Sequence, residues 1–143
     1  MPNGYLLDAN IFRLYVQGDP LTIAQMAVHA QEVFLSSVTI EEMVVGRLNL
    51  ISRARSGKGG ISIVDAHAGL IGLLDDIRPI PTLIYSDAAQ TVFKSFPQAV
   101  LRIGPQDCRI AAQAIAHDMT VVTRNLRDFL AIGASCEDWS SIM

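Results

Sequence analysis

Apolar and polar positions follow two different patterns along this chain. Short apolar runs that stop at polar residues predict buried strands, and apolar residues at helical spacing predict helices between them. Strands are expected at residues 4–7, 33–35, 78–83, 120–122 and 134–137. Helices are expected at about residues 10–17, 21–31, 39–53, 61–77, 86–96, 104–118 and 125–130. This alternation predicts a single domain over residues 1–143, a three-layer α/β/α fold with a mostly parallel central sheet of four to five strands.

The composition is that of a globular protein with a large core. Half of the 143 residues are apolar and the mean hydropathy is +0.34, which excludes intrinsic disorder. The longest stretch without a charge, residues 20–31, has 12 residues, whereas a membrane span needs about 20 apolar ones. No basic segment followed by an apolar one comes after Met1, so we expect no signal peptide. Cys108 and Cys136 lack CxxC spacing, and we therefore expect a reduced, cytoplasmic protein without membrane contact.

Polar residues stand where several apolar runs end or where the next helix begins. The candidate site residues are Asp8, Glu42, Asp107, Asn125 and Asp128. Ligands of open α/β sheets bind beyond the carboxyl ends of the strands, so a parallel sheet would gather these side chains at one edge. Carboxylates that lie close together raise one another's pKa and destabilise the metal-free protein.

Each of these residues also has a purely structural explanation. Asp8 and Asn125 fit the N-cap position of the helix that follows them. Asp107 and Asp128 fall in a first helical turn, where a carboxylate interacts favourably with the helix dipole. The sequence alone leaves the capping and the ligand interpretations open for each residue taken singly.

The acid after the second strand has a detailed alternative of this kind. Thr39 and Glu42 have the spacing of a capping box, with Thr39 as the N-cap, and Val38 and Met43 would form its hydrophobic staple. Helical periodicity does not decide whether Glu41 or Glu42 faces the strand ends.

A divalent cation would offset the repulsion within such a carboxylate cluster. Mg²⁺ prefers oxygen ligands and is typically held by one or two carboxylates together with phosphate oxygens. Such a site suits phosphodiester hydrolysis. The net charge of −3 by itself argues against a nucleic-acid partner. A metal site built from acids weakens that argument, because the cation neutralises part of this charge. Without the four acids at the candidate site the remaining ten acids face 11 bases, so the acidity belongs to the site rather than to the rest of the surface.

Five segments, in order, resemble the motifs of PIN domains. They are Leu6–Asn10, Ser36–Gly46, Ile103–Asp107, Val122–Phe129 and Glu137–Trp139. In the second motif a glycine follows the acid by four residues, and this spacing selects Glu42 over Glu41. The resemblance covers nearly the whole chain, and among PIN proteins a short domain of this kind is most similar to the VapC-type toxins.

The resemblance implies a Mg²⁺- or Mn²⁺-dependent endoribonuclease that leaves 5′-phosphate and 3′-hydroxyl ends. It also implies a homodimer and a small antitoxin partner that blocks the site. Asp8, Glu42 and Asp107 would be the acidic metal ligands. Many relatives have an aspartate where this chain has Asn125, so Asp128 is expected to supply the missing charge as a fourth ligand. Thr123 would contribute a hydroxyl to the same site.

Basic residues near the motifs are candidates for contacts to RNA phosphates, which position a strand without reading its sequence. They are Arg13, Arg47, Arg53, Arg55, Lys58, Arg124 and Arg127. Three of them lie in the glycine-rich segment at residues 53–60, which we expect to be a mobile loop. Two alternatives remain at this stage: a catalytically weak PIN-like module that acts by binding protein or RNA, and an α/β phosphohydrolase. Haloacid-dehalogenase phosphatases have Asp-x-Asp where this chain has Asn10 as the third residue.

Overall fold

The computed structural model describes residues 3–141, and these contain five strands and eight helices. The strands are β1 (Tyr5–Leu7), β2 (Val33–Ser36), β3 (Thr82–Leu83), β4 (Thr120–Val122) and β5 (Cys136–Glu137). The helices are α1 (Ala9–Gln17), α2 (Pro20–Val28), α3 (Ser37–Arg55), α4 (Ile63–Ile77), α5 (Asp87–Ser95), α6 (Gln98–Leu101), α7 (Pro105–Ala116) and α8 (Leu126–Ile132). The strands form one parallel sheet in the order β3-β2-β1-β4-β5. The predicted α/β class and the parallel sheet are confirmed.

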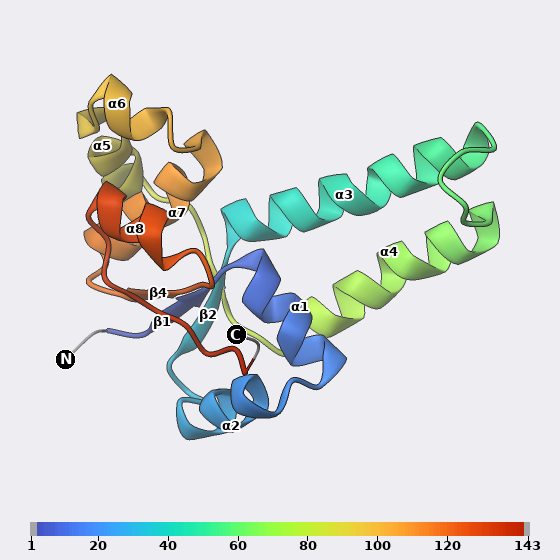
Figure 1. Cartoon of the computed structure of the whole chain (residues 1–143), viewed down its shortest axis with the longest axis horizontal. Helices are drawn as coiled ribbons and strands as arrows, with labels where there is room; N and C mark the ends of the chain where they lie inside the picture. The colour runs from blue at the N-terminus through green and yellow to red at the C-terminus, as the bar shows by residue number, and fades with distance from the viewer. Residues whose placement is uncertain (1–2, 142–143) are drawn as a thin grey trace.

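β1 is the central strand, and its apolar residues serve both faces of the sheet. Because side chains alternate along a strand, Leu7 packs into an apolar cluster with α1, α2, α3 and α4, whereas Leu6 packs into a second cluster with α7 and α8. Both leucines are fully buried. Figure 1 shows α7 and α8 on one side of the sheet and α1 and α2 on the other, which gives the three layers. This double burial explains why the strands are continuous apolar runs.

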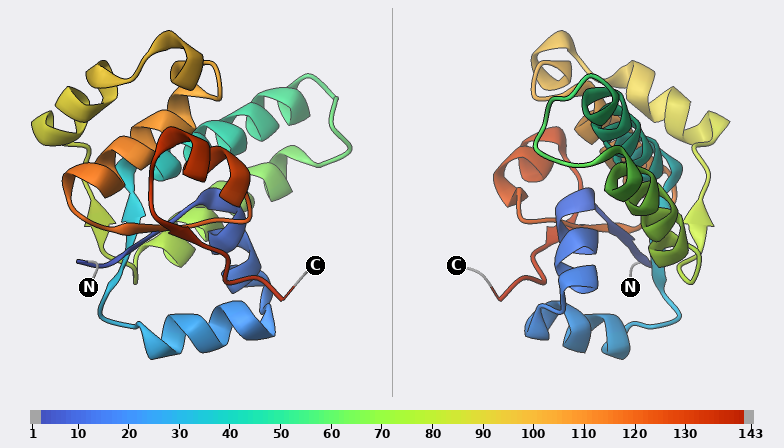
Figure 2. Two further views of the ribbon diagram at one scale, coloured as in Figure 1. Left: turned by 60° about the vertical axis from the view of Figure 1, so that its left-hand side comes forward. Right: turned by 90° about the vertical axis from the view of Figure 1, so that its right-hand side faces the viewer.

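The helices α3 and α4 form an arm that projects from the sheet (Figures 1 and 2). They lie side by side, and at Gly69 a Cβ atom would come within 3.0 Å of the Arg47 guanidinium. A loop joins them at the tip of the arm, but it is shorter than predicted: α3 continues to Arg55, so Arg53 and Arg55 are helical and only Lys58 of the three predicted loop cations lies in it. Several apolar side chains of the arm are exposed by between 47 and 74%: Val45, Leu48, Val64 and Ile71. None of the helices within residues 3–141 is long and apolar enough to cross a membrane.

The predicted capping box at the start of α3 is wrong. The helix begins at Ser37, and Ser36 is its N-cap, with its hydroxyl oxygen accepting from the backbone N–H of Val38 (2.9 Å). The Ser36 hydroxyl donates to the side-chain carbonyl of Gln113 on α7, whose amide in turn donates to the carbonyl of Leu83 (3.1 Å). This buried tertiary network fixes the helix start, and Thr39 is consequently a buried residue inside the first turn.

Other boundaries differ from the predictions where prolines and irregular turns intervene. The short helix α6 was not predicted, because four residues give too little periodicity to detect. α2 ends at Val28 rather than near residue 31. β3 is limited to two residues within the expected extended stretch, since Pro79 and Pro81 cannot donate to a strand ladder.

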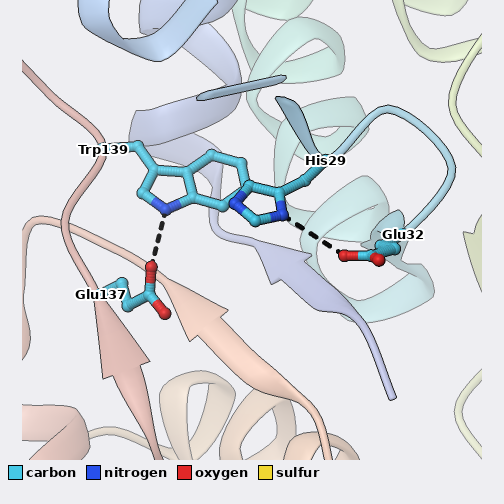
Figure 3. A network of polar contacts seen from close by, with 4 residues as sticks. All are labelled: His29, Glu32, Glu137 and Trp139. Carbon is cyan, nitrogen blue, oxygen red and sulfur yellow. Dashed lines mark hydrogen bonds and ion pairs between the residues drawn. The ribbon is translucent and has the colours of Figure 1, made fainter. Parts of the chain in front are cut away.

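The C-terminal segment is held against the sheet by a group of contacts that we call the C-terminal anchor, formed by Tyr5, His29 and Trp139. The Trp139 indole stacks on the His29 ring with a centroid separation of 5.2 Å and lies 5.0 Å from the Tyr5 ring. Figure 3 shows the indole N–H donating to Glu137 (3.1 Å) and His29 facing Glu32 (3.3 Å). Trp139 is only 2% exposed, so it buries a large apolar surface.

Candidate functional site

Asp8 stands directly after β1 and is 8% exposed. Its Oδ1 accepts a hydrogen bond from the backbone N–H of Ile11 (3.0 Å), so it does cap α1. Its Oδ2 accepts the hydroxyl hydrogen of Thr123 (2.6 Å), which follows the neighbouring strand β4. The capping and the strand-edge interpretations of Asp8 therefore hold together, because each carboxylate oxygen has a different partner.

Thr123 extends this network to the residues after β4. Its hydroxyl oxygen accepts from the backbone N–H of Asn125 (2.9 Å). The Asn125 side chain makes no capping bond to α8, although it occupies the N-cap position. Instead its amide donates to Oδ2 of Asp128 (2.9 Å). Asn125 thus orients the Asp128 carboxylate. The prediction that Asn125 caps α8 through its side chain is wrong, because the side chain bonds to Asp128, one turn ahead, instead.

Glu42 and Glu41 face different surroundings. Glu41 is exposed, and its carboxylate accepts from the Gln106 side-chain amide (3.1 Å) on α7. Glu42 is partly buried and interacts electrostatically with Asp107 and Asp8. The Glu41–Gln106 bond ties α3 to the first turn of α7, where Asp107 lies. The tertiary arrangement directs Glu42, and not Glu41, toward the other strand-end carboxylates.

The pKa values of three carboxyl groups reflect this crowding. Burial is the main cause that raises the pKa of Asp8, and the hydrogen bonds from Thr123 and Ile11 partly oppose it. Burial also raises the pKa of Glu42, and the charges of Asp107 and Asp8 add to the effect. The pKa of Asp107 is raised by burial and then by Asp8 and Asp128. Electrostatic repulsion thus links Asp8, Glu42, Asp107 and Asp128, and we call these four acids the strand-end site.

The strand-end site is open rather than a closed metal cage. Within residues 3–141, no three acidic, histidine or cysteine side chains are grouped closely enough to surround an ion by themselves. Mg²⁺ does not require such a cage, because one or two carboxylates with water and phosphate oxygens suffice. The donors are hard carboxylate oxygens, and burial together with neighbouring acids raises the pKa of Asp8, Glu42 and Asp107. The residues present fit a hydrated divalent cation.

Asp138 is a further acid near the site that the sequence analysis did not select. It follows β5 as Asp8 follows β1, and its charge contributes to the raised pKa of Asp8. Its Oδ1 accepts from the backbone N–H of Ser140 (2.8 Å). The rule that polar residues after a strand are informative would have found it, since residues 134–137 were already predicted to be a strand.

A pocket of about 270 Å³ opens beside Glu42 between α1, α3 and α4. Its lining combines apolar side chains with two basic residues, Arg13 and Arg47, and two acidic ones, Glu42 and Asp76. Arg13 is exposed and donates to Asn10 (3.1 Å), while Arg47 lies along the arm. Two arginines therefore lie near Glu42, in a pocket whose charges balance.

Known proteins share both the sequence pattern and this architecture. The chain is 25% identical over 138 residues to a Shigella flexneri protein named tRNA(fMet)-specific endonuclease VapC, a match that covers 95% of this chain and 98% of the relative. The DNA-bound VapBC structure from Salmonella typhimurium has a TM-score of 0.73 at 23% identity and covers 95% of this chain and 98% of its own. A toxin-antitoxin complex from Klebsiella pneumoniae has a TM-score of 0.65 at 18% identity and covers 91% and 93%.

The family assignment rests on a match over most of the sequence. The sequence model of the PIN domain matches residues 5–134, a range that contains all five strand-end residues predicted from the sequence. The same range includes β1, β2, β3 and β4 and ends just before β5. This chain belongs to the PIN domain family.

Proposed function

We propose that this chain is a divalent-metal-dependent endoribonuclease and the toxin of a type II toxin–antitoxin pair. The observation that carries the proposal is the cluster of four carboxylates at the carboxyl ends of parallel strands in a PIN domain. The relative from Shigella flexneri, named an endonuclease specific for a tRNA, makes tRNA the first substrate class to test. The whole chain, residues 1–143, acts as one such domain.

In this proposal Asp8, Glu42, Asp107 and Asp128 hold Mg²⁺ or Mn²⁺. The ion would lower the pKa of a bound water and stabilise the negative charge that develops on the phosphate. Asp8 is held in place from both sides by Ile11 and Thr123, so its position requires no rearrangement.

Two of these ligands and several neighbouring residues also orient the reactants. Glu42 and Asp107 accept hydrogen bonds from the attacking water and align it with the phosphodiester, because their carboxylates are the partly buried acceptors beside Asp8. Asn125 keeps Asp128 facing the site through its amide. Arg13, Arg47 and Lys58 of the loop at the tip of the arm contact the RNA backbone, because cationic side chains offset the repulsion between RNA and the acidic site.

Protein partners complete the proposal. The arm exposes four large apolar side chains, Val45, Leu48, Val64 and Ile71, and exposed apolar surface marks contacts with other proteins. We assign this surface to a second copy of the chain and to a small antitoxin, which would block access to the strand-end site. The complex from Klebsiella pneumoniae, which has the same fold, supports the antitoxin part.

The test is cleavage of tRNA and structured RNA with Mg²⁺ or Mn²⁺, followed by identification of the RNA ends. We expect 5′-phosphate ends, no cleavage in EDTA, and loss of at least about 100-fold in rate for Asp8→Asn and Glu42→Gln, because both remove a metal ligand. Glu41→Gln is the matched control, since it removes the neighbouring charge and keeps an oxygen that accepts from Gln106.

Two results would overturn the proposal. Equal rates for Glu42→Gln and Glu41→Gln would remove Glu42 from the site. A folded wild-type protein that binds RNA but cleaves none with either metal would favour the alternative of a PIN-like binding module, for which Asn125 at the fourth motif is the supporting observation.

A further inference from the structure

Thr39 is a buried hydroxyl residue without a hydrogen-bond partner. Its exposed fraction is 0%, and it is the sole case among residues 3–141 of a buried side-chain polar atom that lacks a partner. Three other buried hydroxyl groups are bonded: Thr22 to Asp19 and Trp139, Ser36 to Gln113, and Thr123 to Asp8. Thr39 therefore differs from Thr22 and Thr123, whose buried hydroxyl groups are bonded within the fold.

An unpartnered buried hydroxyl lowers the stability of a fold, and valine would fill the same volume without that cost. A threonine inside a helix usually bonds to the carbonyl one turn earlier, but the Thr39 hydroxyl does not. The first turn of α3 is fixed by the Ser36 cap and its bond to Gln113, so Thr39 has little freedom to seek another partner.

The position of Thr39 relates it to the strand-end site. Thr39 and Glu42 are three residues apart in α3 and lie on the same helix face. Met43, one residue further, packs in the cluster that contains Leu7 and Ile11, the residues on either side of the Asp8 turn. Thr39 is thus on the face of α3 that carries Glu42 and the buried Met43.

We propose that the Thr39 hydroxyl is a positioning group of the cation site and gains its missing acceptor when a hydrated divalent cation binds. Its acceptor is a carboxylate oxygen of the strand-end site that turns toward the hydroxyl when the ion binds, because the hydroxyl has no surface open to a water molecule. A hydroxyl donates to such an anionic oxygen, and a partner that is absent from the metal-free fold explains why Thr39 is unsatisfied there. This inference rests on the proposed function and adds a residue to its metal site.

The experiment compares Thr39→Val with Thr39→Ser by thermal unfolding in EDTA and in Mn²⁺, and by calorimetric titration with Mn²⁺. In EDTA, Thr39→Val should unfold at the same temperature as the wild type or higher, because it removes an unpartnered hydroxyl. Its affinity for Mn²⁺ should fall about tenfold, the lower end of the range for residues that support metal ligands. Thr39→Ser keeps the hydroxyl and should bind Mn²⁺ nearly as the wild type does.

Thr22→Val is the matched control. Thr22 is also fully buried, but its hydroxyl donates within the fold to Asp19 (2.7 Å) and to the Trp139 carbonyl (2.9 Å). This variant should unfold at a lower temperature with and without Mn²⁺ and keep the wild-type affinity for the ion. A different result for Thr39→Val and Thr22→Val separates a metal-linked hydroxyl from an ordinary buried one.

The outcomes distinguish the two proposals. If Mn²⁺ neither binds nor stabilises the wild type, the proposed metal site itself fails. If the wild type binds Mn²⁺ and Thr39→Val binds it equally well, or if Thr39→Val is clearly less stable in EDTA, the role of Thr39 is overturned. Should Thr39→Val not fold, Thr39→Ala replaces it. Weaker Mn²⁺ binding by Thr39→Ala than by Thr39→Ser supports the proposal, and equal affinities refute it.

Discussion

Asp8 and Asp19 are two aspartates with the same local role and opposite electrostatics. Each caps a helix by accepting the backbone N–H three residues ahead, from Ile11 and Thr22 respectively. Burial among other acids raises the pKa of Asp8. Hydrogen bonds from the hydroxyls of Ser141 and Thr22 lower the pKa of Asp19 to about 2. A negatively charged capping aspartate is therefore stabilising at Asp19, beside the C-terminal anchor, and destabilising at Asp8, in the strand-end site.

The surroundings of the C-terminal anchor and the strand-end site also differ in whether their buried hydroxyl groups have hydrogen-bond partners. Around the C-terminal anchor, Thr22 is fully bonded and the ring of Trp139 is covered by His29 and Tyr5. In the strand-end site, Thr39 is unpartnered and the acids repel one another. The first region contributes to stability, whereas the second sacrifices stability and needs a ligand to recover it.

The largest expected effect on stability is at the C-terminal anchor. Trp139→Ala should lower the free energy of unfolding by about 3–5 kcal/mol, because it empties a buried aromatic site. Chemical denaturation measures the change. Trp139→Phe is the control that keeps an aromatic ring and removes the bond to Glu137, and it should cost less. A loss for Trp139→Ala below about 1 kcal/mol, the centre of the range for ordinary substitutions, would contradict the assignment of this region as an anchor.

The next effect is a pH dependence of opposite sign in the two regions. The pKa values of Asp8, Glu42 and Asp107 are raised above 3.8, 4.5 and 3.8, so the metal-free fold binds protons more tightly than the unfolded chain does. Their contribution to stability is present at low pH and is lost as the pH rises through the raised pKa values. The contribution of Asp19 is present above 3.8 and is lost as the pH falls toward about 2.

Thermal unfolding in EDTA and in Mn²⁺, as a function of pH above 4.5, tests the first half of this prediction. The stabilisation by Mn²⁺ should grow as the pH rises, because the ion replaces protons that leave the carboxylates. Asp107→Asn should flatten this dependence, since it removes one of the coupled acids. A stabilisation by Mn²⁺ that is independent of pH over this range would argue against a carboxylate cluster that titrates above its ordinary pKa.

The smallest effect is the direct contrast between the two caps. Asparagine caps a helix about as well as aspartate, so Asp8→Asn in EDTA at neutral pH should unfold at the wild-type temperature or above it, because it relieves repulsion. Asp19→Asn should unfold at a lower temperature, since it loses an anionic acceptor for Ser141 and Thr22. Scanning calorimetry of both variants measures the difference. The reverse order of stabilities would show that capping, and not charge repulsion, dominates at Asp8.

Much of this protein could be predicted from its sequence because the relevant signals are local. The apolar run before Asp8 and the run before Thr123 predicted two buried strands, and the structure shows that they are neighbours, with Leu7 paired to Val122. The five candidate site residues were all chosen because they follow strands or open helices. Four of them carry the charges that the fold brings together.

Predictions from local sequence patterns were wrong or undecided where a residue far away in the chain forms a hydrogen bond with one of the side chains concerned. The Thr39–Glu42 capping box has a valid pattern, but Gln113, which is 77 positions from Ser36, stabilises an earlier helix start. Asparagine is a residue type that favours the N-cap position, yet the Asn125 side chain donates to Asp128. Glu41 and Glu42 are indistinguishable by periodicity, and the bond from Gln106 on another helix separates them.

The sequence by itself determined the order of strands and helices and the kinds of side chain at each strand end, because hydrophobic periodicity and polar breaks are properties of neighbouring residues. Only the tertiary structure decided which of these side chains share an environment: Glu42 with Asp107 and Asp8, and Asp138 with Asp8. It also decided that the Thr39 hydroxyl has no partner. Burial and the pairing of charges depend on residues that are far apart in the chain, and parallel packing of the strands is what brings their ends to one edge.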